Sequence, residues 1–389
     1  MQILLVTGPG GAGSSTVAAA TALQVAASGA RCVLLTARGP AVAGLDAAVR
    51  VEVVEPQRAL EDVWGRHADA LAAALPVLTV PPASSVVAVP GVPELALLAA
   101  LAGHAASGES DVVVLDAGPL PVAVALLALP GTLRWWLAQA VPQRLRVLAT
   151  LRAAVVPGRP GGVATALAGV AGLEALLDRV HLADPDRTAV HLVLRPEPSA
   201  VEDLRAAGTG LAVLGQRVAS VTVGRLLPAG AGEWAARRAA VQRAAVAGVR
   251  GLLDGTGTVR EVVEAAVPPA DVAGLRALDA AVPAASTAAS GPAAAAPVPH
   301  RDGGGWLLAL PLPFARRGEV ELTRWGDDLV VTAAGRRRSL PLDPLLRRCT
   351  VAGGRLVGPG TAAATLDIRF TPDPAQWPAG LLDTEESTA

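Results

Sequence analysis

The sequence predicts an α/β fold, in which a mostly parallel sheet carries helices on both faces, followed by a small C-terminal antiparallel β-sandwich. In residues 1–281, continuous apolar runs alternate with helical stretches, which is typical of parallel strands buried on both faces. Residues 282–303 are rich in Ala and Pro and lack periodicity, as expected of a linker. In residues 304–370, apolar and polar residues alternate, as in strands that expose one side to solvent.

The first strand is expected at QILLVTG (2–8), a buried run that ends in a glycine turn. A helix follows from Ser14 and ends at Gly29. Further strands are expected at 31–37, 111–119, 188–198 and 217–228, with a helix at 199–215. Ligands of such sheets bind at the C-terminal ends of the strands, where the stretch 8–16 and Asp116 would lie.

The C-terminal region is expected to form short strands joined by glycine turns. These strands are EVELTRW (319–325), a strand–turn–strand unit over 328–342, and ATLDIRF (364–370). Within that unit, the arginine-rich RRRSL (336–340) is expected to be a solvated turn. The tail, 371–389, is expected to be disordered.

Composition narrows the classes of partner. The chain has 389 residues, enough for a large α/β domain and a smaller one. Its net charge is -1 and its charged residues are scattered, so neither nucleic acid nor an anionic membrane is expected as a partner. Cys32 and Cys349 lie far apart without a CxxC pair, and the five histidines have no metal-ligand spacing. This pattern favours a reducing, cytoplasmic location and no zinc site.

The mean hydropathy of +0.45 comes from Ala, Val and Leu and does not by itself indicate a membrane protein. The longest uncharged stretch, 70–93, contains five prolines. A second apolar stretch, 117–133, contains Pro119, Pro121 and Pro130. Because proline removes a backbone hydrogen-bond donor, we expect neither stretch to span a membrane.

The chain contains no Lys, Asn or Tyr, and only two Ile. These residues have A/T-rich codons, which indicates a high-GC bacterial gene. Some missing residues therefore reflect mutational drift, although Arg remained available for any position that needs a positive charge.

The stretch VTGPGGAGSST (6–16) has the outline of a phosphate-binding glycine loop between a strand and a helix. Backbone N–H groups of such a loop form an anion-binding nest at a helix N-terminus. The candidate nucleotide-binding residues are Gly8, Gly10, Gly11, Ala12, Gly13, Ser14, Ser15 and Thr16, together with Asp116 after the third predicted strand. No lysine is present to hold the phosphates.

A dinucleotide site is an alternative interpretation. Gly8, Gly10 and Gly13 also fit G-x-G-x-x-G, and Arg38 at the end of the second strand could accept the 2′-phosphate of NADP. Short-chain reductases need a Tyr and Lys pair, which this chain lacks, so only an NADP-type binding module remains open.

The same residues also have purely structural interpretations. The glycines could form only a tight turn, and Ser15 and Thr16 could be helix-cap residues. The adjacent Trp135 and Trp136 are expected to pack in the core or at a domain interface.

The chain resembles the ArsA/Get group of P-loop ATPases of the SIMIBI type, in the bacterial branch with a C-terminal small-heat-shock (alpha-crystallin-like) domain. The resemblance covers nearly all of the chain and rests on the order of its motifs. Besides the loop, the matching stretches are 54–64, 90–101, 111–119, 182–205 and the region from Trp306 to Leu342.

The resemblance implies ATP and Mg²⁺ as cofactors. Ser15 matches the hydroxyl that ligates Mg²⁺, and Asp116 matches the acid of the second switch, which makes these two the candidate metal-side residues. Both family lysines are missing: Pro9 stands where the dimer-crossing lysine would be, and Ser14 where the β/γ-phosphate lysine would be.

Other parts of the matched site are also altered. The first switch, ARGPAVAG (37–44), has no carboxylate to orient water. In the second switch Asp116 and Pro119 persist, and Gly224 replaces the Asn that contacts adenine. Phosphoryl transfer depends on positioned charge and a positioned nucleophile. We therefore assign no catalytic residue and expect weak or absent ATPase activity.

The sequence thus predicts a pseudo-ATPase or non-catalytic subunit. It would form a homodimer, or a heterodimer with a lysine-bearing paralogous ATPase, and could contact a client protein through the sandwich. A residually active targeting or chaperone-like ATPase is the alternative. Methionine-rich client helices are not apparent, since Met1 is the only methionine.

Overall fold

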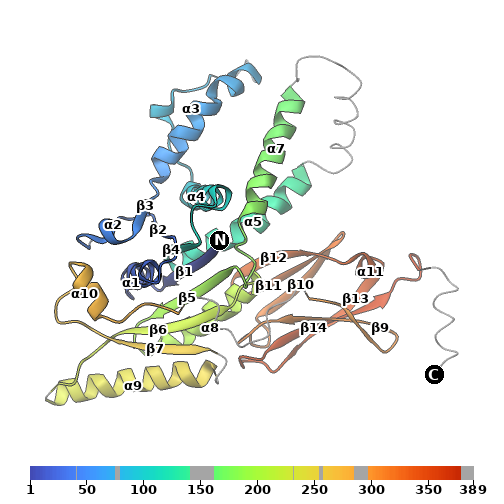
Figure 1. Ribbon diagram of the computed structural model, residues 1–389. Helices are drawn as coiled ribbons and strands as arrows, with labels where there is room; N and C mark the ends of the chain where they lie inside the picture. The colour runs from blue at the N-terminus through green and yellow to red at the C-terminus, as the bar shows by residue number, and fades with distance from the viewer. Residues whose placement is uncertain are drawn as a thin grey trace.

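A computed structural model gives the architecture of the chain (Figure 1). It describes residues 1–389 except 41, 75–78, 141–161, 231, 254–256, 284–296 and 378–389.

The central sheet is parallel and confirms the predicted α/β class. Its seven described strands are ordered β3-β2-β4-β1-β5-β6-β7. They are β1 (Gln2–Gly8), β2 (Cys32–Thr36), β3 (Arg50–Val53), β4 (Val112–Pro119), β5 (Thr188–Leu194), β6 (Val218–Leu226) and β7 (Thr258–Val263). The sequence did not predict β3 and β7, which are short edge strands interrupted by charged residues.

Helices cover both faces of this sheet. Those described are α1 (Ser14–Ala27), α2 (Leu45–Ala48), α3 (Pro56–Ala74), η1 (Ala83–Ser85), α4 (Val92–Ser107), α5 (Leu120–Ala140), α7 (Gly162–Arg179), α8 (Ala200–Val213), α9 (Glu233–Leu253) and α10 (Val272–Ala277). Successive β1 residues face opposite sides: Leu4 packs with α1 and α10, and Ile3 with α4 and α5. The strands therefore read as unbroken apolar runs.

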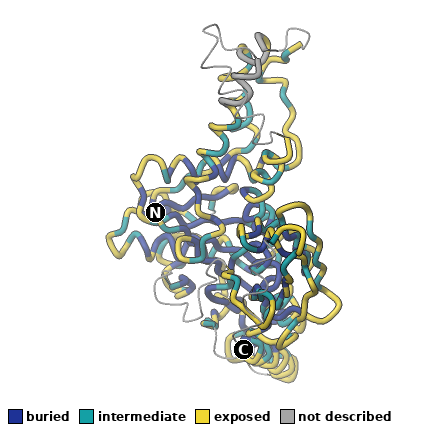
Figure 2. Tube along the Cα trace, turned by 90° about the vertical axis from the view of Figure 1, so that its right-hand side faces the viewer, coloured by how far each residue is buried: buried dark blue, intermediate teal, exposed yellow. Residues whose placement is uncertain are grey.

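Two helices project from the sheet. α3 and α7 extend away from it on the same side (Figure 1). Buried residues concentrate in the body of the molecule, while the projecting part is mostly exposed (Figure 2).

The prolines of the second apolar stretch do not interrupt its helix, contrary to the argument from sequence. Pro121 lies in the first turn of α5, where its missing N–H has no intrahelical partner to lose. Pro130 is buried inside the helix. By length and composition, α5 is the one helix of the described chain that could cross a membrane, and Val124, Leu126 and Leu127 on it are buried in the domain core.

The C-terminal region forms the predicted sandwich from two antiparallel sheets, β10-β11-β12 and β13-β14-β9-β8, around a shared core. Its elements are β8 (His300–Asp302), β9 (Gly305–Pro311), β10 (Val320–Trp325), β11 (Asp328–Ala333), β12 (Arg336–Pro341), α11 (Pro344–Arg347), β13 (Cys349–Val357) and β14 (Thr365–Pro372). The expected solvated turn at 336–340 is wrong, because these residues pair with β11 and the turn lies at Ala334 and Gly335.

Some residues of the predicted linker and tail are ordered. Val282 is buried, and its amide donates to Thr21 Oγ1 at 3.0 Å. β8 also falls within 282–303, whereas 284–296 lies outside the described residues. In the predicted tail, Trp377 Nε1 donates to the Arg348 carbonyl at 2.8 Å, and 378–389 lies outside the described residues.

The sandwich docks on α8. The ring of Phe314 belongs to the same buried cluster as Leu204 and packs against Gly208. Thr209 Oγ1 donates to the Pro313 carbonyl at 2.7 Å, and Arg316 pairs with Glu202 at 2.9 Å. The two domains therefore share buried apolar surface.

Candidate functional site

The glycine loop is a tight connection between β1 and α1. The Ala12 amide donates to the Pro9 carbonyl at 3.2 Å, which closes the turn. Gly11 (φ 77°) and Gly13 (φ 95°) adopt left-handed conformations that disfavour residues with a Cβ. At Gly8 a Cβ would lie 2.0 Å from the Val193 carbonyl oxygen, so β5 passes directly against the start of the loop.

The N-terminus of α1 faces this loop without a cap. Gly13 is the N-cap residue and supplies no side-chain hydrogen bond, and the first turn contains no acidic residue. The first-turn amides of a helix have no intrahelical acceptor and carry a partial positive charge. Ser15 is exposed there, while Ser14 and Thr16 are half-buried. This backbone arrangement fits an anion such as a phosphate group.

Asp116 lies beside the loop at the same edge of the sheet. β4 pairs with β1 so that Asp116 is opposite Val6 and Pro119 is opposite Gly8. Its carboxylate is buried, accepts from the Gly118 amide at 3.2 Å, and lies 3.3 Å from Thr36 Oγ1. The structure thus brings the predicted acid next to the predicted loop.

The loop also approaches the end of β6. A Cβ at Gly224 would lie 3.4 Å from the Ala12 carbonyl oxygen. The residue matched to the family's adenine-contacting Asn is therefore beside the loop but has no side chain to contact a base.

The site lacks the lysines of the loop and the carboxylate of the first switch, although Asp116 is present. Pro9 and Ser14 are uncharged, and the chain contains no lysine. Residues 37–44 contain no carboxylate, and Ala41 among them lies outside the described residues. Among the described residues, no three His, Cys, Asp or Glu side chains gather into a metal cluster.

Sheet order argues against the dinucleotide alternative. In dinucleotide-binding folds of strand order 3-2-1-4-5-6, the second strand neighbours the first, so its last residue reaches the ribose. Here β4 lies between β1 and β2. Arg38 therefore follows a strand that is one position too far from the glycine loop.

Sequence reasoning missed three supporting residues. Thr36 contacts Asp116, Val193 contacts Gly8, and the buried Thr7 donates from Oγ1 to the Gly118 carbonyl at 2.9 Å. A threonine at the end of a buried strand was the only local signal, and the partners depend on strand order.

Comparisons with known proteins agree with the arrangement of the domains. The profile of the family described as anion-transporting ATPase matches residues 1–281, and that of an HSP20-like domain found in ArsA matches residues 303–370. An uncharacterized protein of Streptomyces coelicolor is 35% identical over 98% of this chain and 100% of its own length. A protein of Mycobacterium tuberculosis is 30% identical over 97% of each chain. With a glycine loop, an adjacent acid and a docked sandwich in the family's order, this chain belongs to the ArsA family of anion-transporting ATPases, in the form that carries an HSP20-like domain.

Proposed function

We propose that this member of the ArsA family binds Mg-nucleotide without hydrolysing it and acts in the cytoplasm as the non-catalytic partner of a lysine-bearing paralogous ATPase. One observation carries the proposal. The loop keeps the backbone shape of an anion site, with Gly11 and Gly13 left-handed and α1 uncapped, while both loop lysines and the first-switch carboxylate are missing.

The retained groups suit binding more than turnover. Backbone N–H groups of Gly10, Gly11 and residues 13–16 would hold the phosphates, since the Ala12 amide already donates to the Pro9 carbonyl, and Ser15 and Asp116 would lie on the metal side. Bound Mg²⁺ supplies charge neutralisation for the phosphates. Without a lysine at either loop position, the charge that develops in phosphoryl transfer has no cationic partner from this loop.

The missing loop lysine at position 9 also favours a heterodimer over a homodimer. In the family's arrangement one subunit contributes a lysine across the shared interface, and here Pro9 occupies that position. Two copies of this chain would leave both sites without that lysine. A lysine-bearing paralogue would supply it to one site.

Calorimetric titration with Mg-ATP and Mg-ADP tests nucleotide binding. We expect weak binding by the parent and at least about tenfold tighter binding by Pro9→Lys/Ser14→Lys, since a charge-assisted hydrogen bond contributes about 1.5–3 kcal/mol. Gln24→Lys is a control for added positive charge, because it places one lysine at an exposed position of α1 beyond the first turn. Binding restored only in the double variant would refute the proposal that the parent binds nucleotide.

Phosphate release tests the non-catalytic assignment. The purified chain alone should release no phosphate above the background of buffer with Mg-ATP. It should also co-purify with a lysine-bearing paralogue and change that protein's rate of hydrolysis. Hydrolysis by the chain alone would instead support a residually active targeting or chaperone-like ATPase.

A further inference from the structure

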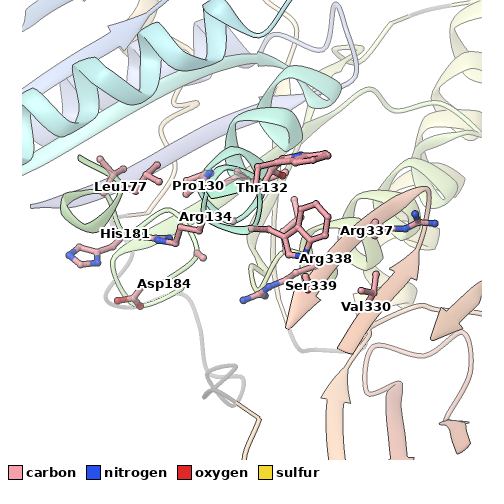
Figure 3. Close-up of a pocket in the computed structure, with 18 of the residues that line it drawn as sticks. Pro130, Thr132, Arg134, Leu177, His181, Asp184, Val330, Arg337, Arg338 and Ser339 are labelled. Carbon is pink, nitrogen blue, oxygen red and sulfur yellow. The ribbon is translucent and has the colours of Figure 1, made fainter. Parts of the chain in front are cut away.

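A cavity of about 1070 Å³ lies between the two domains, away from the glycine loop. Its walls come from α5, from the end of α7 with the loop that follows, and from the sheet β10-β11-β12. Figure 3 shows Thr132, Arg134 and Leu177 on one side and Val330 and Arg338 on the other. Its volume suits a small-molecule ligand, since such sites typically occupy about 300–1000 Å³.

The walls are largely apolar and the rim is aromatic. Leu127, Leu177 and Val330 line the interior. Trp136 and Trp325, one from each domain, also line the cavity but remain 61% and 63% exposed. Two large exposed indole rings, one from each domain, provide apolar contact surface for a ligand that binds between them.

Three arginines line the cavity, and Arg338 is the one that burial separates from solvent. Arg338 is half-buried, and burial lowers the pKa of its guanidinium. Its nearest recorded partner is the Val213 carbonyl, 3.4 Å from Nη1, and it forms no ion pair with a carboxylate of the described residues. Gly215 makes room for it, because a Cβ there would lie 2.4 Å from Nη1. A desolvated cation without a counter-charge is costly unless an anion joins it.

A second donor has no acceptor. Trp135 Nε1 is buried and lacks a hydrogen-bond partner in the described structure. Its ring packs edge-on against that of Trp136, with 4.9 Å between the ring centroids. The tryptophan pair lines the cavity between the two domains, where Trp136 remains largely exposed instead of packing as predicted from the sequence, and the buried Trp135 Nε1 has no acceptor. Buried donors normally have a partner.

The acidic residues of the lining are already engaged. Asp178 pairs with Arg134 at 2.9 Å. Asp184 accepts from the Asp186 amide at 2.9 Å and lies 3.8 Å from Arg187. The cavity therefore offers a hydrogen-bond donor without an acceptor and a cation without a counter-charge. Its carboxylates, in contrast, already have partners.

We propose that this cavity binds a small amphipathic carboxylate, with its apolar body between the tryptophan rim and the aliphatic wall and its carboxylate at Arg338 and Trp135 Nε1. The planar guanidinium matches a carboxylate in geometry and charge. A single terminal anionic group suits this site better than a nucleotide, because Asp178 and Asp184 also line the cavity and their carboxylates would repel several phosphates.

Titration of the full chain with dodecanoate, below its micelle-forming concentration, tests the site through tryptophan fluorescence and calorimetry. Dodecanoate should saturate at one molecule per chain. Dodecan-1-ol and dodecyltrimethylammonium have the same body without the negative charge, and should bind at least about tenfold more weakly.

Variants locate the ligand. Arg338→Gln should weaken dodecanoate binding at least about tenfold, and Trp135→Phe, which keeps an aromatic ring and removes the N–H, severalfold. Arg355→Gln is the matched control, because Arg355 is exposed on β13 and does not line the cavity; the affinity of this variant should stay within about twofold of the parent.

Thermal unfolding separates loss of the site from loss of the fold. Arg338→Gln should unfold no earlier than the parent, because it removes an unpaired buried charge. If that variant does not fold, Trp135→Phe decides by itself. Equal binding of dodecanol and dodecanoate, or an unchanged affinity in a folded Arg338→Gln or Trp135→Phe variant, would overturn the proposal.

Discussion

His191 is fully buried in β5, where its Nδ1 lies 2.7 Å from Ser220 Oγ and its Nε2 has no partner in the described chain. Burial lowers its pKa to about 4, whereas an unfolded chain gives about 6.5. The unfolded state therefore takes up a proton first as the pH falls. Stability should be full above about pH 6.5 and decline by about 3 kcal/mol towards pH 4.

Urea unfolding at pH 7 and pH 4.5 checks this expectation. His191→Gln should reduce the difference in unfolding free energy between the two pH values. His300→Gln, at an exposed position, should leave it unchanged. An equal pH dependence in the parent and His191→Gln would show that this histidine does not contribute.

A second prediction at the residue scale concerns the substitution of Gly8. Gly8→Ala places a Cβ 2.0 Å from a backbone oxygen of β5, and no rotamer relieves that overlap. We expect a loss of about 3 kcal/mol in unfolding free energy. Gly10→Ala meets no atom within 4 Å and should change stability by less than about 0.5 kcal/mol. Similar losses in both variants would contradict the close approach of β5.

At the scale of elements, α8 contains glycines at 208 and 210, although Gly costs about 1 kcal/mol inside a helix. A Cβ at Gly208 would lie 2.7 Å from the Phe314 ring, so we expect Gly208→Ala to destabilise the protein by about 1–3 kcal/mol. Gly103→Ala on α4, where nothing lies within 4 Å, should instead stabilise it by about 0.5–1 kcal/mol. Denaturant unfolding of both variants measures the contrast, and a gain in both would show that the sandwich tolerates a methyl group on α8.

At the scale of the molecule, the sandwich and the ATPase-type domain share a core through Phe314. We expect a single calorimetric unfolding transition in the parent. Phe314→Ala should remove about 3–5 kcal/mol and separate the two domains into distinct transitions. Two transitions already in the parent would show that docking on α8 is weak. Because truncation near residue 282 would expose this face of α8, point variants are the better test of what the sandwich contacts.

The sequence by itself determined the strand–loop–helix unit around residues 2–29, the strand that carries Asp116, the change from parallel sheet to sandwich, and the absence of lysine at the loop. Each of these features follows from one contiguous stretch of sequence, through the spacing of its apolar residues or the spacing of a motif. The tertiary structure decided that β4 separates β1 from β2, that Thr36 supports Asp116, and that RRRSL forms a strand with Arg338 at a cavity. It also decided that α5 continues through Pro130. These features depend on contacts between residues far apart in the chain, where packing outweighs local propensity, and no short stretch of sequence encodes them.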